Sequence, residues 1–415
     1  VSTSGYDHVV ARVSKDTEVV ETFRAPLCSA ADDDPFELTL SVPAELASHR
    51  IEVALAASGV ETLVADVDDV VAGDILIVQG QSNAVARQFD GDANGNQGPF
   101  LRSFGTRAED GLATSADLSW HTAEGNASEG PGAVGQWSLR LGRLLIEAHG
   151  VPIAILNGAR GGRPITYFQR NDDDPEDLAS SYGRLLYRAR AAAVDGRVRA
   201  ILWYQGEADS GDPIGHHDGF VALYEDWRED FPSVEQVYVT QIRNGCGSPS
   251  SEVREVQRRF ADELDSVSVM STTGLDAHDG CHYAYEGGYE LLGVRYAALL
   301  GRDLYGDPDV PDIDAPNVDR LEASADAAEV TLFSRDAAST LTFDPGAEAH
   351  FVLEGSSAVV TSGRAEGATI VLVIAGDARG ATGLTYLGHS GAGPWVTNAT
   401  GIGLLGFHAV PIEGL

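Results

Sequence analysis

A serine at the end of an apolar run is the first residue in this chain whose position suggests catalytic chemistry. Residues 74–78 (Asp-Ile-Leu-Ile-Val) are typical of a strand buried on both faces, and Gly80-Gln81-Ser82-Asn83 follows that strand. Open α/β sheets place their ligands at the carboxyl ends of such strands, so Ser82 is a candidate nucleophile. Gly80 allows a tight turn and the close approach of another group. An ordinary turn of the same residue types is the alternative.

Two further polar segments follow apolar runs and could stabilise a negatively charged oxygen. In residues 157–163 the pair Gly161-Gly162 can leave a main-chain N–H open to the site, although such pairs are also common in flexible turns. In residues 203–209 the amide of Gln205 could be a side-chain donor. Glu207 and Asp209 could form an acid–base pair, but we expect them to fasten neighbouring loops or to cap the next helix.

A third segment, residues 278–282 (His-Asp-Gly-Cys-His), could supply a general base. The carboxylate of Asp279 can fold back onto Nδ1 of His282, three residues later, and leave Nε2 for the serine. His278 stands nearer to the strand, and we expect a structural role for it. A zinc site is the alternative, but no Cys/His spacing elsewhere completes one. Nucleophilic catalysis by a serine with a histidine base needs neither a metal nor an organic cofactor, so we expect none.

The elements that would position these segments alternate between strands and helices. Apolar runs at 75–78, 152–156, 200–204, 237–242 and 267–271 alternate with amphipathic segments within 137–148, 185–189, 220–227, 253–260 and 291–299. This alternation implies a parallel sheet with right-handed crossovers and helices on both faces. We expect a flavodoxin-like, three-layer α/β/α domain over residues 73–306.

Two β-rich segments flank this domain. Residues 1–72 alternate with period two at 8–13, 36–40 and 51–55, and predict a small sandwich-like module whose acidic turn at 32–35 is solvated. Residues 307–316 are rich in Pro and Asp, as is typical of a linker. Residues 317–415 predict a second β module, which could stand alone or pair with the first. Its expected strands are 329–333, 340–343, 350–353, 370–374 and 384–387.

The stretch that follows Ser82, residues 89–133, shows little periodicity and is rich in Gly, Asp, Asn and Ser. We expect it to be irregular and to shape a binding site rather than to be filler. Residues 90–95 match the opening of a calcium loop. Leu101 stands where such a loop needs a bidentate glutamate, which argues against calcium.

Taken in order, the four polar segments resemble the blocks of the SGNH hydrolases, specifically the sialate O-acetylesterase-like branch of carbohydrate acetylesterases. The resemblance covers residues 74–306. It implies Ser82 as nucleophile, His282 as base and Asp279 as the residue that orients the base. It also implies an oxyanion hole made by the N–H groups of Ser82 and Gly161 and by the side chain of Gln205.

Two positions depart from the wider family. Broader SGNH enzymes carry asparagine in the third block. This chain has Gln205-Gly206-Glu207 there, as the acetylesterase branch does. Ala84 stands where many relatives carry methionine, so ester hydrolysis is implied more firmly than a preference for acetyl groups. Further residues could contact the substrate, although loop arginines are usually solvated or ion-paired. They are Gln81, Asn83, Arg160, Gly162, Arg163, Glu207 and Arg243.

The three cysteines leave the redox compartment open. Cys281 lies in the loop of His282, and Cys246 follows the fourth expected strand. A disulfide between them would pin the loop and imply an oxidising compartment, whereas two free thiols are the alternative. We expect Cys28 to be a lone buried thiol.

Charge narrows the range of partners. The formal net charge is −35 and Lys15 is the only lysine, so we expect neither nucleic acid nor an anionic membrane as a partner. No apolar run reaches membrane-spanning length. The sequence starts at Val1 without methionine, which leaves room for a removed leader. We expect a secreted or periplasmic location. The sequence does not indicate an oligomeric state.

The function expected from these observations is that of a serine esterase that removes acyl groups, foremost O-acetyl groups, from a carbohydrate. One alternative is a lipid or aryl esterase that uses the same three residues. The other is a carbohydrate-binding protein whose hydrolase domain is inactive.

Overall fold

The strand that precedes Ser82, β5 (Asp74–Gly80), lies inside a large sheet. The computed structural model describes residues 2–28, 35–246, 250–388 and 391–415, and within them the sheet order is β13-β12-β11-β5-β10-β6-β8. Strands β11, β12 and β13 run parallel to β5. The five expected strands thus stand in the order 2-1-3-4-5 of flavodoxin-like sheets. The other bounds are β10 (Ile153–Asn157), β11 (Val198–Tyr204), β12 (Gln236–Thr240) and β13 (Val267–Met270).

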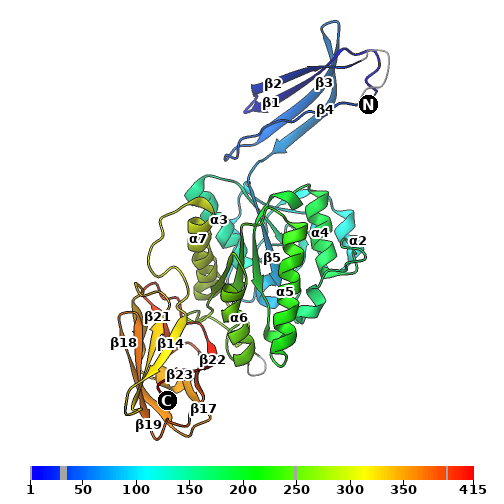
Figure 1. Ribbon diagram of the computed structural model, residues 1–415. Helices are drawn as coiled ribbons and strands as arrows, with labels where there is room; N and C mark the ends of the chain where they lie inside the picture. Colours follow the sequence, from blue (N-terminus) through cyan, green and yellow to red (C-terminus); the bar gives the residue numbers. More distant parts are fainter. Residues whose placement is uncertain (1, 29–34, 247–249, 389–390) are drawn as a thin grey trace. The chain divides into compact units, whose positions relative to one another are not determined.

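Three helices pack on one face of this sheet: α4 (Ser181–Ala191), α5 (Pro213–Asp230) and α6 (Ser251–Glu263) (Figure 1). Their apolar residues share a core with alternate strand residues, because successive side chains of a strand point to opposite faces. The strand residues of that core include Ile75, Ile77, Ile201, Trp203, Val237 and Val239.

Two helices contact the opposite face: α3 (Gln136–His149) and α7 (Glu290–Tyr305). Trp137 of α3 and Tyr296 of α7 have ring centroids 5.4 Å apart. Tyr238 of β12 also points to this face, and its ring centroid lies 5.9 Å from that of Tyr296. The residues on either side of it in β12, Val237 and Val239, belong to the core shared with α4, α5 and α6. All five expected helices are therefore present, and they lie on both faces of the sheet.

The stretch after Ser82 is more ordered than the sequence predicts. The large sheet is extended beyond β10 by β6 (Leu101–Phe104) and β8 (Trp120–Thr122). A second pair of strands forms between β7 (Thr106–Arg107) and β9 (Gly130–Pro131). The helix α2 (Gly111–Ala116) lies between β7 and β8 in the sequence. The expectation of an irregular stretch is wrong in this respect. These elements are too short to show periodicity, and tertiary pairing rather than local sequence forms them.

The described part of residues 1–72 forms one antiparallel sheet of order β2-β1-β3-β4, not two packed sheets. The strands are β1 (His8–Lys15), β2 (Glu18–Pro26), β3 (His49–Ala57) and β4 (Val60–Val70). Residues 36–40 are irregular, although their alternation predicted a strand. The acidic residues Asp32–Asp34 lie outside the described residues.

The C-terminal segment builds its sheets from its own strands, in the part of the chain that is described. One has the order β18-β19-β15-β14-β23, another β17-β20-β22, and β16 pairs with β21. Side chains from both larger sheets share one core. The bounds are β14 (Val318–Ala323), β15 (Glu329–Ser334), β16 (Leu341–Phe343), β17 (Phe351–Glu354), β18 (Val359–Glu366), β19 (Thr369–Ala375), β20 (Gly383–Tyr386), β21 (Val396–Asn398), β22 (Phe407–Val410) and β23 (Ile412–Glu413).

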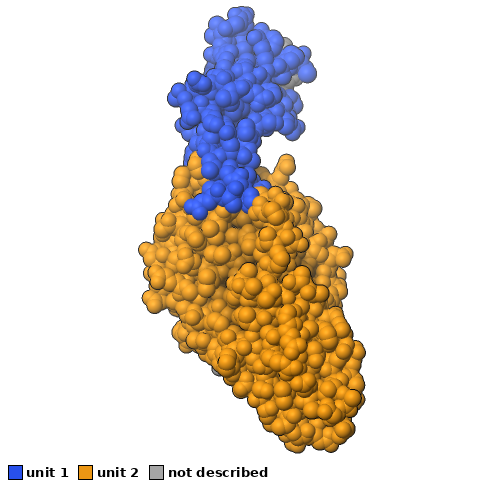
Figure 2. Space-filling model, turned by 90° about the vertical axis from the view of Figure 1, so that its left-hand side faces the viewer, with its two compact units in different colours: residues 1–74, 146–153 blue, residues 75–145, 154–415 orange. Residues whose placement is uncertain are grey.

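The chain divides into two compact units, residues 1–74 with 146–153 and residues 75–145 with 154–415 (Figure 2). The C-terminal strands thus belong to the same unit as most of the large sheet. Among the described residues, no helix combines the length and the apolar character needed to cross a membrane.

Candidate active site

Ser82 is the first residue of a short helix, α1 (Ser82–Val85), directly after β5, and it is partly exposed. Gly80 has a φ of +133°, and a Cβ added there would lie 2.1 Å from the carbonyl oxygen of Tyr204. Only glycine therefore lets β5 and β11 approach so closely, as the sequence predicts. The N–H of Ser82 has no acceptor within the helix, because the first turn of a helix leaves its donors unpaired.

The second loop, after β10, is fastened beside Ser82. The N–H of Arg160 donates to Gly80 O at 2.8 Å, and Asn157 Nδ2 donates to Ala84 O at 2.9 Å. A Cβ added to Gly161 would lie 3.6 Å from Ser82 Cβ. Gly161 is exposed, so its main chain borders both the serine and solvent.

The loop of the candidate base is folded around Asp279. Its Oδ1 accepts hydrogen bonds from the N–H groups of Cys281 at 2.8 Å and His282 at 2.7 Å, and its Oδ2 lies 3.5 Å from His282 Nδ1. Burial opposes ionisation of the carboxyl, but the two N–H groups hold the pKa of Asp279 below its usual value. The side chain is 57% exposed. The sequence correctly predicts that this carboxylate faces Nδ1.

Asn83 joins the serine loop to the histidine loop. Its buried Nδ2 donates to Cys281 O at 3.1 Å and to Glu207 Oε1 at 3.0 Å. Its Oδ1 accepts from the hydroxyl of Tyr289 at 2.8 Å. The residue after Ser82 is thereby hydrogen-bonded to the residue before His282, although 198 positions separate the two in the sequence.

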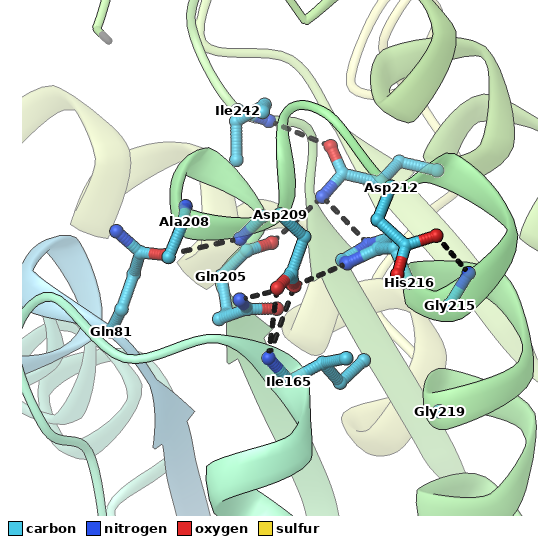
Figure 3. A network of polar contacts seen from close by, with 12 residues as sticks. Gln81, Ile165, Gln205, Ala208, Asp209, Asp212, Gly215, His216, Gly219 and Ile242 are labelled. Atoms are coloured by element: carbon cyan, nitrogen blue, oxygen red, sulfur yellow. Dashed lines mark hydrogen bonds and ion pairs between the residues drawn. The ribbon is translucent and has the colours of Figure 1, made fainter. Parts of the chain in front are cut away.

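Gln205 does not have a free amide donor. Its Nε2 donates to Asp209 Oδ2 at 2.6 Å (Figure 3). It also donates to Arg163 O at 3.2 Å, so both of its hydrogens are used. Asp209 also accepts from the N–H of Ile165 and lies 3.1 Å from His216 Nδ1. The amide of Gln205 therefore holds loops together here instead of pointing a donor at an oxyanion.

Glu207, Gln81 and Asn83, which the sequence suggested as substrate contacts, are buried and hydrogen-bonded to other loops. Gln81 Oε1 accepts from the N–H groups of Gly206 at 3.3 Å and Ala208 at 3.2 Å (Figure 3). Burial raises the pKa of Glu207 to about 7, against the hydrogen bonds that favour its ionised form. The expected loop-fastening role of Glu207 and Asp209 is confirmed, whereas Asp212 caps the next helix.

The three candidate arginines also bind protein groups. Arg160 forms ion pairs with Glu109 and Glu129, and Arg163 pairs with Glu109 at 2.8 Å. Arg243 is buried; it donates to Gly280 O and lies 3.0 Å from His278 Nε2. Arg243 therefore supports the histidine loop. Gly162, at φ +69°, has open space on its Cβ side.

A disulfide joins Cys246 to Cys281, the residue next to His282. This settles the alternative that the sequence left open between a bridge and two thiols. Cys28 is exposed, so the expectation of a buried thiol is wrong. It lies after β2, a strand on which several apolar side chains are also exposed.

Phe89 is the site residue that the sequence did not single out. Its ring is stacked on the imidazole of His282, with centroids 4.1 Å apart and planes 8° from parallel. The guanidinium of Arg87 lies 4.8 Å from the Phe89 centroid. The only available signal was an aromatic residue in the loop after the nucleophile, which does not by itself identify a partner.

The described residues contain no group of three or more His, Cys, Asp or Glu side chains suited to a metal ion. In the calcium-like stretch, Asp92 Oδ1 accepts from the N–H of Asn94 and from Asn126 Nδ2. The Asn94 side chain in turn contacts Glu124 and the N–H of Gly125. These polar side chains therefore organise the loop through hydrogen bonds to one another.

Comparison with solved structures finds similar proteins, among them two carbohydrate esterases. A carbohydrate acetylesterase from Xanthomonas citri is 19% identical, with 97% of this chain and 93% of that chain covered and a TM-score of 0.63. A protein from Arabidopsis thaliana is 21% identical over 55% of this chain and 97% of its own, with a TM-score of 0.43. A family two carbohydrate esterase from Cellvibrio japonicus is 13% identical over 72% and 83%, with a TM-score of 0.34.

The family comparison covers the part of the chain that holds all four loops. Residues 72–301 match the family described as carbohydrate esterase, sialic acid-specific acetylesterase, and this match spans more than half of the chain. The sequence resemblance to sialate O-acetylesterase-like enzymes is thus confirmed. The chain belongs to the sialic acid-specific acetylesterase family of carbohydrate esterases, and it is a carboxylic ester hydrolase.

Proposed function

We propose that the protein is a serine esterase that removes O-acetyl groups from a carbohydrate through an acyl-enzyme. The observation that supports this most is the pair of hydrogen bonds from Asn83 Nδ2. One goes to Cys281 O in the loop of His282 and the other to Glu207 Oε1 in the third loop, so Asn83 ties the loop of Ser82 to both. The main chain of Gly161 beside Ser82 adds a group suited to an oxyanion. The similarity to a carbohydrate acetylesterase supports the same assignment at the level of the fold.

In the proposed reaction, Ser82 Oγ attacks the ester carbonyl while His282 Nε2 accepts its proton. The carbonyl oxygen becomes negative and accepts hydrogen bonds from the N–H groups of Ser82 and Gly161. As the intermediate collapses, the C–O bond to the sugar breaks and the imidazolium returns the proton to the leaving oxygen. Water then attacks the acyl-enzyme with the same base, and acetate is released. Asp279 stabilises the imidazolium in both halves.

Gln205 acts indirectly in this proposal. Its hydrogen bond to Arg163 O and the bond from Ile165 N–H to Asp209 hold the chain that follows Gly161. Loss of this support would displace the Gly161 N–H rather than remove a donor. A side-chain contribution to the oxyanion hole would first require Gln205 to break its hydrogen bond to Asp209 or to Arg163 O.

We further interpret the large sheet and its helices as a three-layer SGNH-type domain and the C-terminal strands as a sandwich-like module. The disulfide beside His282 supports a secreted or periplasmic location, because such bridges persist in oxidising compartments. The net charge of −35 favours an acetylated carbohydrate of low charge over nucleic acid or an anionic membrane.

Ser82→Ala tests the proposal. We expect hydrolysis of an acetylated sugar or an aryl acetate to fall at least about 10³-fold, with an unchanged melting temperature. Ser210→Ala, just after the third loop, is the matched control and should keep full activity. Retained turnover by Ser82→Ala would remove Ser82 from its role.

Two further measurements separate the alternatives. Acetyl esters should be hydrolysed faster than butyryl and octanoyl esters, whereas a preference for long chains would indicate a lipid or aryl esterase. The unaltered protein should react with a fluorophosphonate at Ser82. Absence of labelling together with saccharide binding would indicate an inactive binding protein.

A further inference from the structure

We propose that Phe89 is a positioning residue for the base, because its ring fixes the orientation of the His282 imidazole. This inference rests on the proposed function of His282. The two rings lie 4.1 Å apart and are within 8° of parallel, so one face of the imidazole is covered by a hydrocarbon surface. Phe89 has no group that can transfer a proton, and therefore it acts only through His282.

The imidazole needs such support because its carboxylate partner holds it weakly. Asp279 Oδ2 lies 3.5 Å from His282 Nδ1, at the outer limit of a hydrogen bond, and the Asp279 side chain is 57% exposed. Oδ1 is occupied by two main-chain N–H groups. Water can compete for the remaining oxygen. A stacked ring restricts rotation of the imidazole about its Cβ–Cγ bond, and it does so without an ionic contact.

The segment that carries Phe89 is fastened on both sides. The N–H of Gln88 donates to Asn126 O at 2.9 Å, and the N–H of Tyr285 donates to Asp90 O at 2.9 Å. A Cβ added to Gly91 would lie 2.8 Å from the Cβ of Tyr285, so the two chains are in close contact there. Since Tyr285 lies three residues after His282, both rings of the stack are anchored to the same local framework.

The ring of Phe89 has a further contact that holds it in place. The guanidinium of Arg87 lies 4.8 Å from the ring centroid. A cation over an aromatic face is attracted by the ring quadrupole, so Arg87 disfavours rotation of Phe89 away from its place. Phe89 therefore has a neighbour in the Arg87 side chain and another in the His282 imidazole.

The test compares Phe89→Leu, which keeps apolar volume but has no ring, with Phe89→Tyr, which keeps the ring. Phe100→Leu, in the same stretch of chain, is the matched control. The first readout is the NMR shift of the imidazole C–H protons of His282, assigned by comparison with His282→Gln. Ring current from Phe89 should displace these protons upfield, and Phe89→Leu alone should release them downfield.

The second readout is turnover of an aryl acetate. We expect Phe89→Leu to lower kcat about tenfold with little change in KM, whereas Phe89→Tyr and Phe100→Leu keep kcat. Unchanged His282 shifts in Phe89→Leu would overturn the proposal, and so would altered shifts with an unchanged kcat. A loss in Phe89→Tyr as large as in Phe89→Leu would also overturn it. The NMR shifts of His282 can be measured without turnover, so they test the contact with Phe89 independently of activity. Retained activity in Ser82→Ala would refute the proposed function but would leave this contact untouched.

Discussion

The buried carboxyl of Glu207 should make the stability of the protein depend on pH in a way that one substitution removes. Glu207 is 7% exposed, and Asn83 Nδ2 donates to its Oε1 at 3.0 Å. Its Oε2 has no hydrogen-bond partner among the described residues. Glu207→Gln keeps an acceptor for Asn83 at the same place and cannot ionise.

The sign and size of the effect follow from the pKa. Burial raises the pKa of Glu207 from an ordinary value of 4.5 to about 7. A raised carboxyl pKa means that folding favours the protonated form, so this stabilisation is full below pH 4.5 and is lost as the pH rises to 7. The difference in pKa corresponds to about 3 kcal/mol. The free energy of unfolding of Glu207→Gln, minus that of the unaltered protein, should rise by this amount over the same interval.

Urea unfolding at pH 5, 6, 7 and 8 measures this difference, with tryptophan fluorescence as the probe because Trp203 lies in the strand before Glu207. The amide N–H₂ of the new glutamine adds a buried donor, and if it has no acceptor the free energy of unfolding falls by about 1–3 kcal/mol. This loss is the same at every pH, so it does not change the trend. Glu286→Gln, at an exposed position, is the control and should show no such trend. A difference between Glu207→Gln and the unaltered protein that stays flat from pH 5 to 8 would refute the reasoning.

Two further predictions concern the support of the histidine loop. Replacing both Cys246 and Cys281 by serine removes a disulfide between residues 35 positions apart. We expect the free energy of unfolding, measured with urea, to fall by about 3 kcal/mol. We also expect a lower kcat for an aryl acetate. Arg295 of α7 donates to the carbonyls of Ser271, Thr273, Gly274 and Gly401. Arg295→Gln should destabilise the protein by about 2–4 kcal/mol and slow fluorophosphonate labelling of Ser82, and Arg295→Lys should recover only part of both. An unchanged labelling rate in Arg295→Gln would show that these hydrogen bonds of Arg295 do not affect the active site.

The large sheet could be predicted because its strands are short apolar runs and its helices carry one apolar face. The run before Ser82 is buried on both sides, and such runs differ sharply from the polar residues that end them. The same contrast placed Gly161, Gln205 and Asp279 at one edge of the sheet. Local sequence thus determined which loops belong to the site.

The roles of individual side chains could not be predicted in the same way. Gln205 was expected to donate to an oxyanion, yet Asp209 sits four residues later and takes its hydrogen. Asn83 and Gln81 were expected near the substrate, yet both are buried. Each outcome depends on how the loops fold and pack, and neither composition nor spacing determines which polar groups then come within hydrogen-bond distance.

The C-terminal strands present the same problem at a larger scale. The sequence predicted a β module that stands alone or pairs with the N-terminal one, but in the structure this part of the chain contacts the segment between β13 and Asp279. The N–H of Gly403 donates to Thr273 O at 3.1 Å, and Gln241, just after β12, is hydrogen-bonded to both main-chain groups of Gly406. The C-terminal segment is therefore hydrogen-bonded to the chain that follows β12 and to the segment that leads from β13 to the histidine loop.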